Sequence, residues 1–277
     1  MGTSIEKSNI LCLLGMHRSG TSLLANWLYN CGLNLGDNLL KGDFSNKKGH
    51  FEDNDFLSFH KELLKENDLK SNGLFIENLN QITFSQYQLK KLEHLIKFKC
   101  DLHTQWGWKE PRTCLFIHKY LELFPEIKIL IIHRPILDSI KSLLKRDGKR
   151  WEIELKKQSL TRRVAKTIFK KSLKKKFIDK NIDAYIKASL IYLRQLNKIT
   201  IEYSNNVRVI TIDQLISHDY EIFQFLTEKW NFNLTYKDIN SIYSDSLIGQ
   251  KLDINVKTST SDLIDEENLL LNNVMKF

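Results

Sequence analysis

The stretch that most constrains this chain is a short apolar run, a loop of small residues and a second apolar run. It covers Leu11–Leu24, LCLLGMHRSGTSLL, and the loop lies at Gly15–Gly20. The first run is typical of a buried parallel strand, and the second has the spacing of a helix. A strand, a glycine-bounded loop and a helix together place backbone N–H groups at a helix N-terminus, where they bind anions. The sequence therefore predicts an anion site at this loop.

The loop differs from Walker A in the place of its basic residue. The Walker A Lys follows the second glycine and reaches the β- and γ-phosphates, and the Ser or Thr after it holds Mg²⁺. Here Thr21 stands in that place, and the basic side chain is Arg18, inside the loop. Such a loop is poorly suited to a metal–triphosphate. It remains suited to one phosphate, with a positive charge on a neighbouring group.

Length and cysteine usage indicate a globular protein of the cytoplasm. The 277 residues suffice for one large domain or two small ones. No apolar run approaches the ~20 residues of a membrane-spanning helix, and residues 1–9 lack the apolar core of a secretory signal. The four cysteines have no metal or redox spacing, so we expect reduced, buried thiols and a cytoplasmic location.

The net charge of +9 is concentrated in one segment. Between Thr161 and Lys180 there are nine basic residues and one acidic residue, Asp179. Such a run is usually a solvated helix face. It also suits attraction of an anionic acceptor or a membrane surface, as peripheral contact. We expect a single domain over residues 1–277 with a basic helical insertion near 151–180.

Strand and helix signals alternate along the chain. Apolar runs predict strands at Ile10–Leu14, Trp106–Lys109, Ile127–His133 and Val207–Ile212. Periodic segments predict helices at about Thr21–Cys31, Asp55–Glu66, Gln86–Phe98, Thr113–Phe124, Ile136–Lys145, Ile182–Tyr203 and Tyr220–Trp230. Asp147–Gly148 reads as a turn, and the region after Ser244 is weakly patterned. The alternation predicts an α/β fold of three layers, with a mostly parallel central sheet flanked by helices.

Basic residues follow several of the predicted strands. Arg18, Lys109, Arg112 and Arg134 all stand at or just beyond strand ends. In open α/β sheets, ligands bind at the carboxyl ends of the strands. The sequence therefore predicts that these cations surround a polyanionic ligand.

Four motifs, in order along residues 10–230, resemble those of sulfotransferases that use 3′-phosphoadenylyl sulfate (PAPS). Gly15–Ser22, GMHRSGTS, resembles the 5′-phosphosulfate loop of that family. Arg134–Ser142, RPILDSIKS, follows a strand and resembles the 3′-phosphate motif, with Arg and Ser eight positions apart. Lys109–Arg112, KEPR, resembles the Lys-Asp-Pro element of bacterial and tyrosyl-protein members. Val209–Leu215, VITIDQL, is similar to a late strand and acidic turn.

The resemblance implies a P-loop NTPase-like sulfotransferase fold and transfer of a sulfuryl group from PAPS to a hydroxyl or amine. PAPS is then the cosubstrate, and no metal is required. Lys109 is expected to stabilise the leaving phosphate or the sulfuryl oxygens. The residues expected to bind the 5′-phosphate and the transferring group are Arg18, Ser19, Gly20, Thr21 and Ser22, and those expected to bind the 3′-phosphate are Arg134 and Ser142.

A hydroxyl acceptor also needs a base, and the segment Gly49–Glu52, GHFE, offers two candidates. Relatives that share this loop use a Glu shortly after the first strand–helix unit, and Glu52 is the match. His50 is the alternative. Glu52 also suits a plain structural role, as an acidic charge near the N-terminus of the following helix.

Other interpretations of the chain remain open at this stage. A P-loop nucleotide kinase would need a loop Lys and Mg²⁺ ligands, and a nucleic-acid-binding protein would use the basic segment; we expect no nucleic-acid partner. The acceptor is expected to be a glycan, lipid or small molecule, and an anionic glycan or lipid suits the basic segment. His17 and His133 read as packing or loop residues. Trp106 and Trp108 read as core residues, with a place beside the acceptor as the alternative.

Overall fold

The centre of the molecule is a parallel sheet, seen in a computed structural model that describes residues 8–42, 49–156, 170–242 and 260–277. Within these residues the sheet has four strands in the order β2-β1-β3-β4. Their bounds are β1 Asn9–Leu14, β2 Gln105–Lys109, β3 Lys128–His133 and β4 Val207–Thr211. Each strand agrees with its prediction to within one residue at either end.

The register of the strands brings their carboxyl ends to one edge of the sheet. Leu13 of β1 lies beside Lys109, the last residue of β2, and beside Leu130 of β3. His133, the last residue of β3, lies beside Thr211 at the end of β4. The predicted site residues that follow β1, β2 and β3 therefore lie along a common edge, where open α/β sheets bind ligands.

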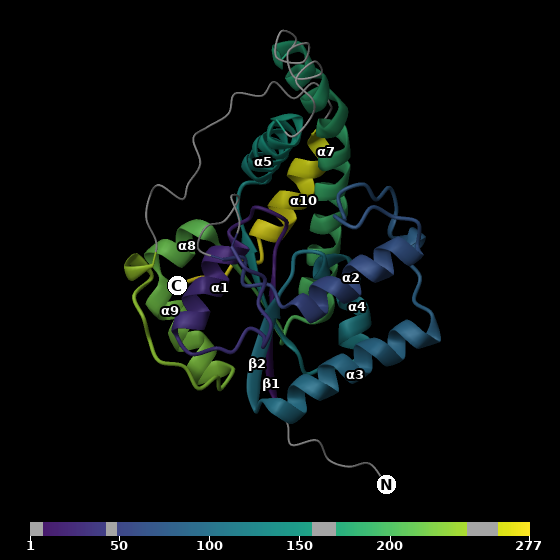
Figure 1. Cartoon of the computed structure of the whole chain (residues 1–277). Coiled ribbons are helices and arrows are strands. Elements are labelled where there is room, and N and C mark those ends of the chain that lie inside the picture. Colours follow the sequence, from purple (N-terminus) through teal and green to yellow (C-terminus); the bar gives the residue numbers. More distant parts are fainter. Residues whose placement is uncertain (1–7, 43–48, 157–169, 243–259) are drawn as a thin grey trace.

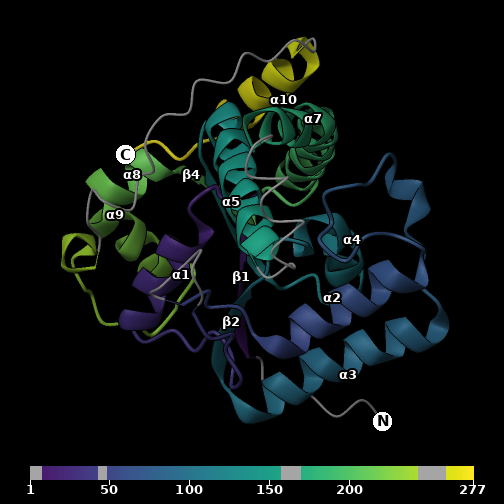
Figure 2. The same ribbon diagram turned by 45° about the horizontal axis from the view of Figure 1, so that its top comes forward.

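Successive side chains alternate between the two faces of the sheet, and each face carries its own core. Leu11 and Leu13 belong to the core beneath α1, α8 and α9, which lie together in Figure 1. Cys12 and Leu14 belong to the larger core on the other face, beneath α2, α3, α4, α5, α7 and α10. Figure 2 shows these two groups of helices on either side of the strands. The predicted three-layer α/β architecture is confirmed.

The helices match most of the predicted segments. On the smaller core they are α1 Thr21–Asn30, α8 Ile212–Ser217 and α9 Asp219–Gln224. On the larger core they are α2 Asn54–Glu66, α3 Gln86–Leu102, α4 Thr113–Leu123, α5 Ile136–Lys156, α7 Lys170–Glu202 and α10 Ser261–Leu271. None of the described helices combines the length and apolar character needed to cross a bilayer.

The two tryptophans of β2 are core residues, as predicted. Trp106 and Trp108 are 1% and 0% exposed. Phe56 of α2 stacks on Trp108 with ring centroids 4.9 Å apart. An aromatic pair of this kind contributes roughly 0.5–1.5 kcal/mol beyond its buried area. The stack fixes the start of α2 against β2, and both elements carry site residues.

α5 continues through Asp147–Gly148, where the sequence predicted a turn. A glycine inside a helix costs about 1 kcal/mol relative to alanine. Contacts with α7 offset this cost: the Tyr185 hydroxyl donates to Asp147 Oδ2 at 2.6 Å, and Trp151 stacks on Phe177 with centroids 6.2 Å apart. The turn prediction is wrong because it considered only local residue preferences.

The C-terminal third differs from the prediction at two further places. α10 forms in the region read as weakly patterned, and its Leu263 and Leu270 are buried in the larger core. The predicted helix Tyr220–Trp230 is α9 followed by a π-helical turn, η2 Phe225–Lys229. Of the expected basic insertion, residues 157–169 lie outside the described residues. α5 and α7 border that segment (Figure 1).

Candidate active site

The loop between β1 and α1 has the backbone turns of an anion-binding loop. φ is 72° at Arg18 and 103° at Gly20, both in the left-handed region. At Gly15, a Cβ would lie 2.5 Å from Ser19 Oγ and 2.7 Å from the carbonyl oxygen of Ile132, so a side chain does not fit. α1 begins directly after Gly20, and no side chain among the described residues caps it. Its first turn therefore offers N–H donors and the positive end of the helix dipole to an anion.

A hydrogen bond joins this loop to the second predicted motif. Arg18 Nε donates to Ser142 Oγ at 3.0 Å, although the two residues are 124 positions apart in the chain. Ser142 lies on α5, about two turns from its start, and its hydroxyl reaches the loop through this bond. The structure thus brings together two of the residues that the motifs predicted for nucleotide binding.

Lys109 ends β2 and lies between the predicted base and the loop. Its side chain is 1% exposed, and its Nζ lies 2.8 Å from Glu52 Oε1. The same Nζ donates to Ser22 Oγ at 3.4 Å. The ammonium therefore lies between the Glu52 carboxylate and the first turn of α1.

Glu52 is held just before α2 and does not cap that helix. The N-cap is Asp53, whose Oδ1 accepts a hydrogen bond from Asp55 N at 2.9 Å. Glu52 turns toward Lys109, with 13% of its side chain exposed. Glu52 thus forms an ion pair with Lys109, and the N-cap of α2 is the residue that follows it. The alternative base, His50, is half-buried on the same segment.

Arg134 occupies the carboxyl end of β3, directly before Pro135 and the start of α5 at Ile136. Its side chain is half-buried. The eight-residue spacing places Arg134 at the beginning of α5 and Ser142 in its second turn. Both therefore belong to the same edge of the sheet as the loop and Lys109.

A buried polar network supports the turn that carries Lys109. Glu110 is fully buried and accepts hydrogen bonds from His60 Nδ1 at 2.6 Å and from Arg112 N at 3.1 Å. The Arg112 guanidinium also pairs with it. Because a carboxylate accepts only, His60 holds a proton on Nδ1, and its Nε2 lies 2.7 Å from the Tyr120 hydroxyl. Burial alone would raise the pKa of Glu110, but Arg112 and His60 outweigh it and lower the pKa to about 2.

His17, within the loop, is a buried and neutral residue. Burial, together with the nearby Arg112 guanidinium, lowers its pKa well below the usual value. Its Nε2 has no hydrogen-bond partner among the described residues, and its ring lies 6.1 Å from that of Tyr192. His17 is thus a packing residue of the loop, as the sequence indicated.

His133 has a partner that the sequence did not reveal. Its Nε2 lies 2.8 Å from Glu267 Oε1 on α10. The same oxygen accepts a hydrogen bond from Ile136 N, at the start of α5, also at 2.8 Å. Glu267 therefore ties the C-terminal helix to the end of β3 and to the start of the helix that carries Ser142.

Sequence reasoning missed Asp53, Glu110, His60 and Glu267, which support the predicted residues. Asp53 and Glu110 directly follow Glu52 and Lys109 in the chain, but their partners Lys99 and His60 come from distant segments, so no local spacing reveals these pairs. Among the described residues, no group of three or more His, Cys, Asp or Glu side chains is arranged to hold a metal ion.

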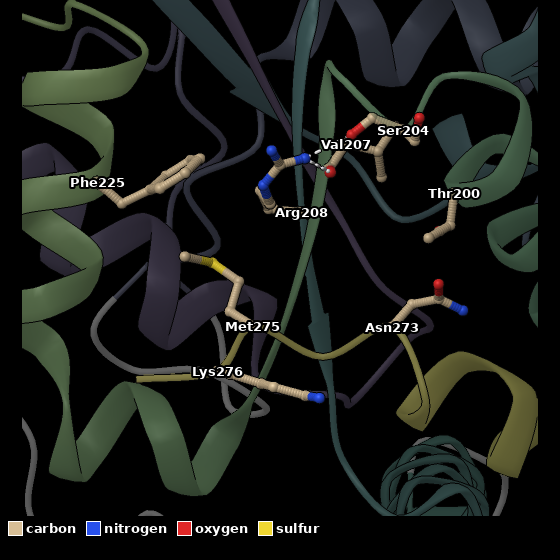
Figure 3. A pocket seen from close by; sticks show the side chains of 8 residues that line it. All are labelled: Thr200, Ser204, Val207, Arg208, Phe225, Asn273, Met275 and Lys276. Carbon is tan, nitrogen blue, oxygen red and sulfur yellow. Dashed lines mark hydrogen bonds between the residues drawn. The ribbon is translucent and has the colours of Figure 1, made fainter.

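A pocket of about 380 Å³ lies elsewhere, beside β4 (Figure 3). Val207 and Arg208, at the amino end of β4, line it together with Phe225 and Met275. Arg208 Nη1 donates to the Val207 carbonyl at 2.7 Å within it. The strands are parallel, so this pocket lies at the opposite end of the sheet from the loop. It contains none of the predicted site residues.

Comparison with known proteins finds similar solved structures but no similar sequence family. No protein-family model matches the sequence, and no curated protein matches it. The sulfotransferase domain of the Synechococcus PCC 7002 olefin synthase is 12% identical, with a TM-score of 0.50 over 98% of this chain and 96% of that one. A sulfotransferase from Alicyclobacillus acidocaldarius is 12% identical, with a TM-score of 0.43 over 96% and 92% of the two chains.

The sulfotransferase domain from the curacin biosynthetic pathway is also 12% identical, with a TM-score of 0.43 over 87% of this chain and 79% of that one. The likeness to the Synechococcus domain extends over nearly the whole of both chains. At this level of identity it concerns the fold. We conclude that this chain has the fold of the sulfotransferases.

Proposed function

We propose that this protein transfers a sulfuryl group from PAPS to a hydroxyl or amine of an acceptor. The observation that carries the proposal is the hydrogen bond from Arg18 to Ser142. It joins the anion loop to the helix that begins beside Arg134. Two anion-binding elements in one site suit a nucleotide with phosphates at two separate positions, as in PAPS.

The residues of the loop fit the 5′ end of such a nucleotide. Ser19 Oγ is buried and has no hydrogen-bond partner among the described residues. The uncapped start of α1 at Gly20 adds backbone donors next to it. We propose that Arg18 and Ser19–Ser22 hold the 5′-phosphate and the sulfuryl oxygens, and that Arg134 and Ser142 hold the 3′-phosphate. Arginine suits these groups because its planar guanidinium pairs with two oxygens at once.

PAPS supplies the sulfuryl group, and the leaving bisphosphate keeps the electron pair of the broken sulfur–oxygen bond. As the acceptor oxygen bonds to sulfur, Glu52 takes the acceptor proton. Lys109 offsets the negative charge that develops on the phosphate oxygen, from its position between Glu52 and Ser22. Catalysis of this kind depends on positioning and on fixed charges. The site cations supply the charge, so the proposal requires no metal.

The acceptor belongs to a broad class in this proposal, namely a glycan, a lipid or a small molecule. An anionic acceptor or a membrane surface would be attracted by the basic segment Thr161–Lys180. We place the protein in the cytoplasm, because all four cysteines are free and three of them are buried.

The test is transfer of labelled sulfate from PAPS to a panel of hydroxyl- and amine-bearing glycans, lipids and small molecules. We expect Arg18→Ala, Arg134→Ala and Glu52→Gln each to lower kcat/KM by roughly 10²–10³-fold, as loss of a charge-stabilising group does. Arg208→Ala is the matched control, because this arginine lies at the far end of the sheet. Full activity in Arg18→Ala, or an equal loss in Arg208→Ala, would contradict the proposal.

A further inference from the structure

A buried ion-pair cluster lies directly behind Glu52. Lys99 of α3 is 1% exposed, and its Nζ lies 2.7 Å from Asp53 Oδ2. The same Nζ lies 2.9 Å from Asp37 Oδ2 and 2.9 Å from Asp55 Oδ2. Asp53 is fully buried, whereas Asp37 and Asp55 are 39% and 44% exposed. One ammonium thus holds the N-cap residue of α2, which is the residue after Glu52.

Stability alone does not account for this arrangement. Taking a lysine and an aspartate out of water carries a large desolvation cost, and apolar residues of similar volume often stabilise a fold as well or better. Burial alone would lower the pKa of Lys99, but its hydrogen bonds to the three aspartates raise it, so the ammonium stays charged. A buried ion pair fixes one geometry, because any displacement leaves a charge unpaired.

The backbone on both sides of Glu52 is fixed as well. Leu40 N donates to the Glu52 carbonyl at 2.7 Å, and Asn54 N donates to the Asn38 carbonyl at 3.0 Å. Phe51, just before Glu52, has a φ of 53°, a left-handed conformation that is costly for a non-glycine residue. Phe51 also packs its ring against that of Tyr29, with centroids 5.7 Å apart. The turn directs the Glu52 carboxylate to Lys109.

We propose that Lys99 and Asp53 form a positioning pair that sets where the Glu52 carboxylate meets Lys109 and the acceptor. This inference rests on the proposed function, in which Glu52 takes the acceptor proton. The side chains of Lys99 and Asp53 are 1% and 0% exposed, so we assign them no contact with substrate. They act through the backbone of residues 51–54, and a base displaced by about 1 Å loses roughly 10²-fold in rate.

Asp53→Asn and Asp37→Asn form a matched pair of variants. Each removes one carboxylate that touches the same ammonium, and asparagine is as good an N-cap residue type as aspartate. We expect Asp53→Asn to lower kcat by roughly 10–100-fold while the KM for PAPS stays within about twofold, because the base moves and the nucleotide site does not. Asp37→Asn should keep most of the wild-type kcat. Equal losses in the two variants, or an unchanged kcat in Asp53→Asn, would overturn the inference.

Alanine variants at two glycines test the positioning role of Asp53 without a change of charge. A Cβ on Gly36 would lie 2.4 Å from Asp53 Oδ2, whereas a Cβ on Gly32 would meet nothing within 4 Å. Both have positive φ, 131° and 101°, so an alanine is strained at either position. We expect Gly36→Ala to lower kcat as Asp53→Asn does, and Gly32→Ala to lower only stability. A folded Gly36→Ala protein with wild-type kcat would contradict the positioning role.

Amide hydrogen exchange separates this inference from the proposed function. The amides of Leu40 and Asn54 report on the segment around Glu52 without any substrate. We expect both to exchange faster in Asp53→Asn than in Asp37→Asn. Unchanged exchange in Asp53→Asn would overturn the inference whatever the activity. Absence of sulfate transfer by the wild type, or full activity of Glu52→Gln, would instead refute the proposed function while the exchange result still stood.

Discussion

At the scale of single residues, the side chains of Lys109–Arg112 lie partly in the proposed active site and partly in the core. Lys109 pairs with Glu52, whereas Glu110 turns the other way and pairs with His60 and Arg112. Neighbouring residues in extended chain point to opposite sides, so this division follows from strand geometry. The buried pairs of Glu110 thereby hold the turn from which the Lys109 ammonium extends.

Glu110 gives the protein a predictable sensitivity to acid. Its folded pKa of about 2 lies below the value of about 4.3 in an unfolded chain, so the unfolded state binds more protons between these values. The stability that ionised Glu110 gives the folded state is therefore complete above about pH 4.5, and it is lost as the pH falls toward 2. Its size is on the order of 3 kcal/mol. Urea unfolding at a series of pH values measures this slope directly.

The control for that slope is Glu122→Gln, which removes a surface carboxylate paired with Lys119. We expect it to unfold like the wild type over this pH range. Glu110→Gln should lose roughly 3–5 kcal/mol at pH 7, since it leaves Arg112 without its buried partner, and should show a shallower acid slope. An identical slope in the wild type and Glu110→Gln would show that Glu110 is not the group responsible.

Residue types could be predicted from the sequence, but their partners could not. Arg18, Lys109 and Ser142 follow from motif spacing, because motif spacing is local. The pairs Lys99–Asp53 and His60–Glu110 join segments 46 and 50 positions apart. Such pairs depend on how helices pack on the sheet, which no local pattern specifies.

At the scale of elements, α5 carries Ser142 and begins directly after Arg134 and Pro135, so it positions the residues proposed for the 3′-phosphate. Its N-terminus is capped from a distance, since Glu267 of α10 accepts hydrogen bonds from both Ile136 N and His133 Nε2. The carboxylate also interacts favourably with the helix dipole. The C-terminal helix therefore stabilises the start of α5, next to Arg134.

Glu267→Ala tests this role. We expect it to lower the free energy of unfolding by about 2 kcal/mol, the value of a charged hydrogen bond, and to speed amide exchange at Ile136. Asp265→Ala, an exposed acidic residue of the same helix, should change stability by less than about 0.5 kcal/mol. Equal effects of the two variants in thermal unfolding would refute the capping role.

The elements themselves were predictable where a strong apolar pattern specifies them. All four strands were predicted, because buried parallel strands are continuous apolar runs. The extension of α5 past Gly148 and the presence of α10 were not predicted. Both rest on packing against α7, and neither has a local signal strong enough to reveal it.

At the scale of the whole molecule, the residues proposed for transfer gather at one edge of the sheet. The loop after β1, Lys109 at the end of β2 and Arg134 after β3 lie at the ends of three adjacent strands. The pocket of Figure 3 lies at the other end of β4. The parallel topology thus explains why motifs spread over the chain form one site. It also predicts a ligand that spans from the loop to the start of α5.

The most direct test of the proposed PAPS site is calorimetric titration of the whole chain with adenosine 3′,5′-bisphosphate and, separately, with ATP and Mg²⁺. We expect the bisphosphate to bind more tightly than ATP–Mg²⁺. Arg134→Ala should weaken bisphosphate binding by roughly 10–100-fold, the loss expected for a charged hydrogen bond to a phosphate. Tighter binding of ATP–Mg²⁺ than of the bisphosphate would contradict the assignment of this site to PAPS.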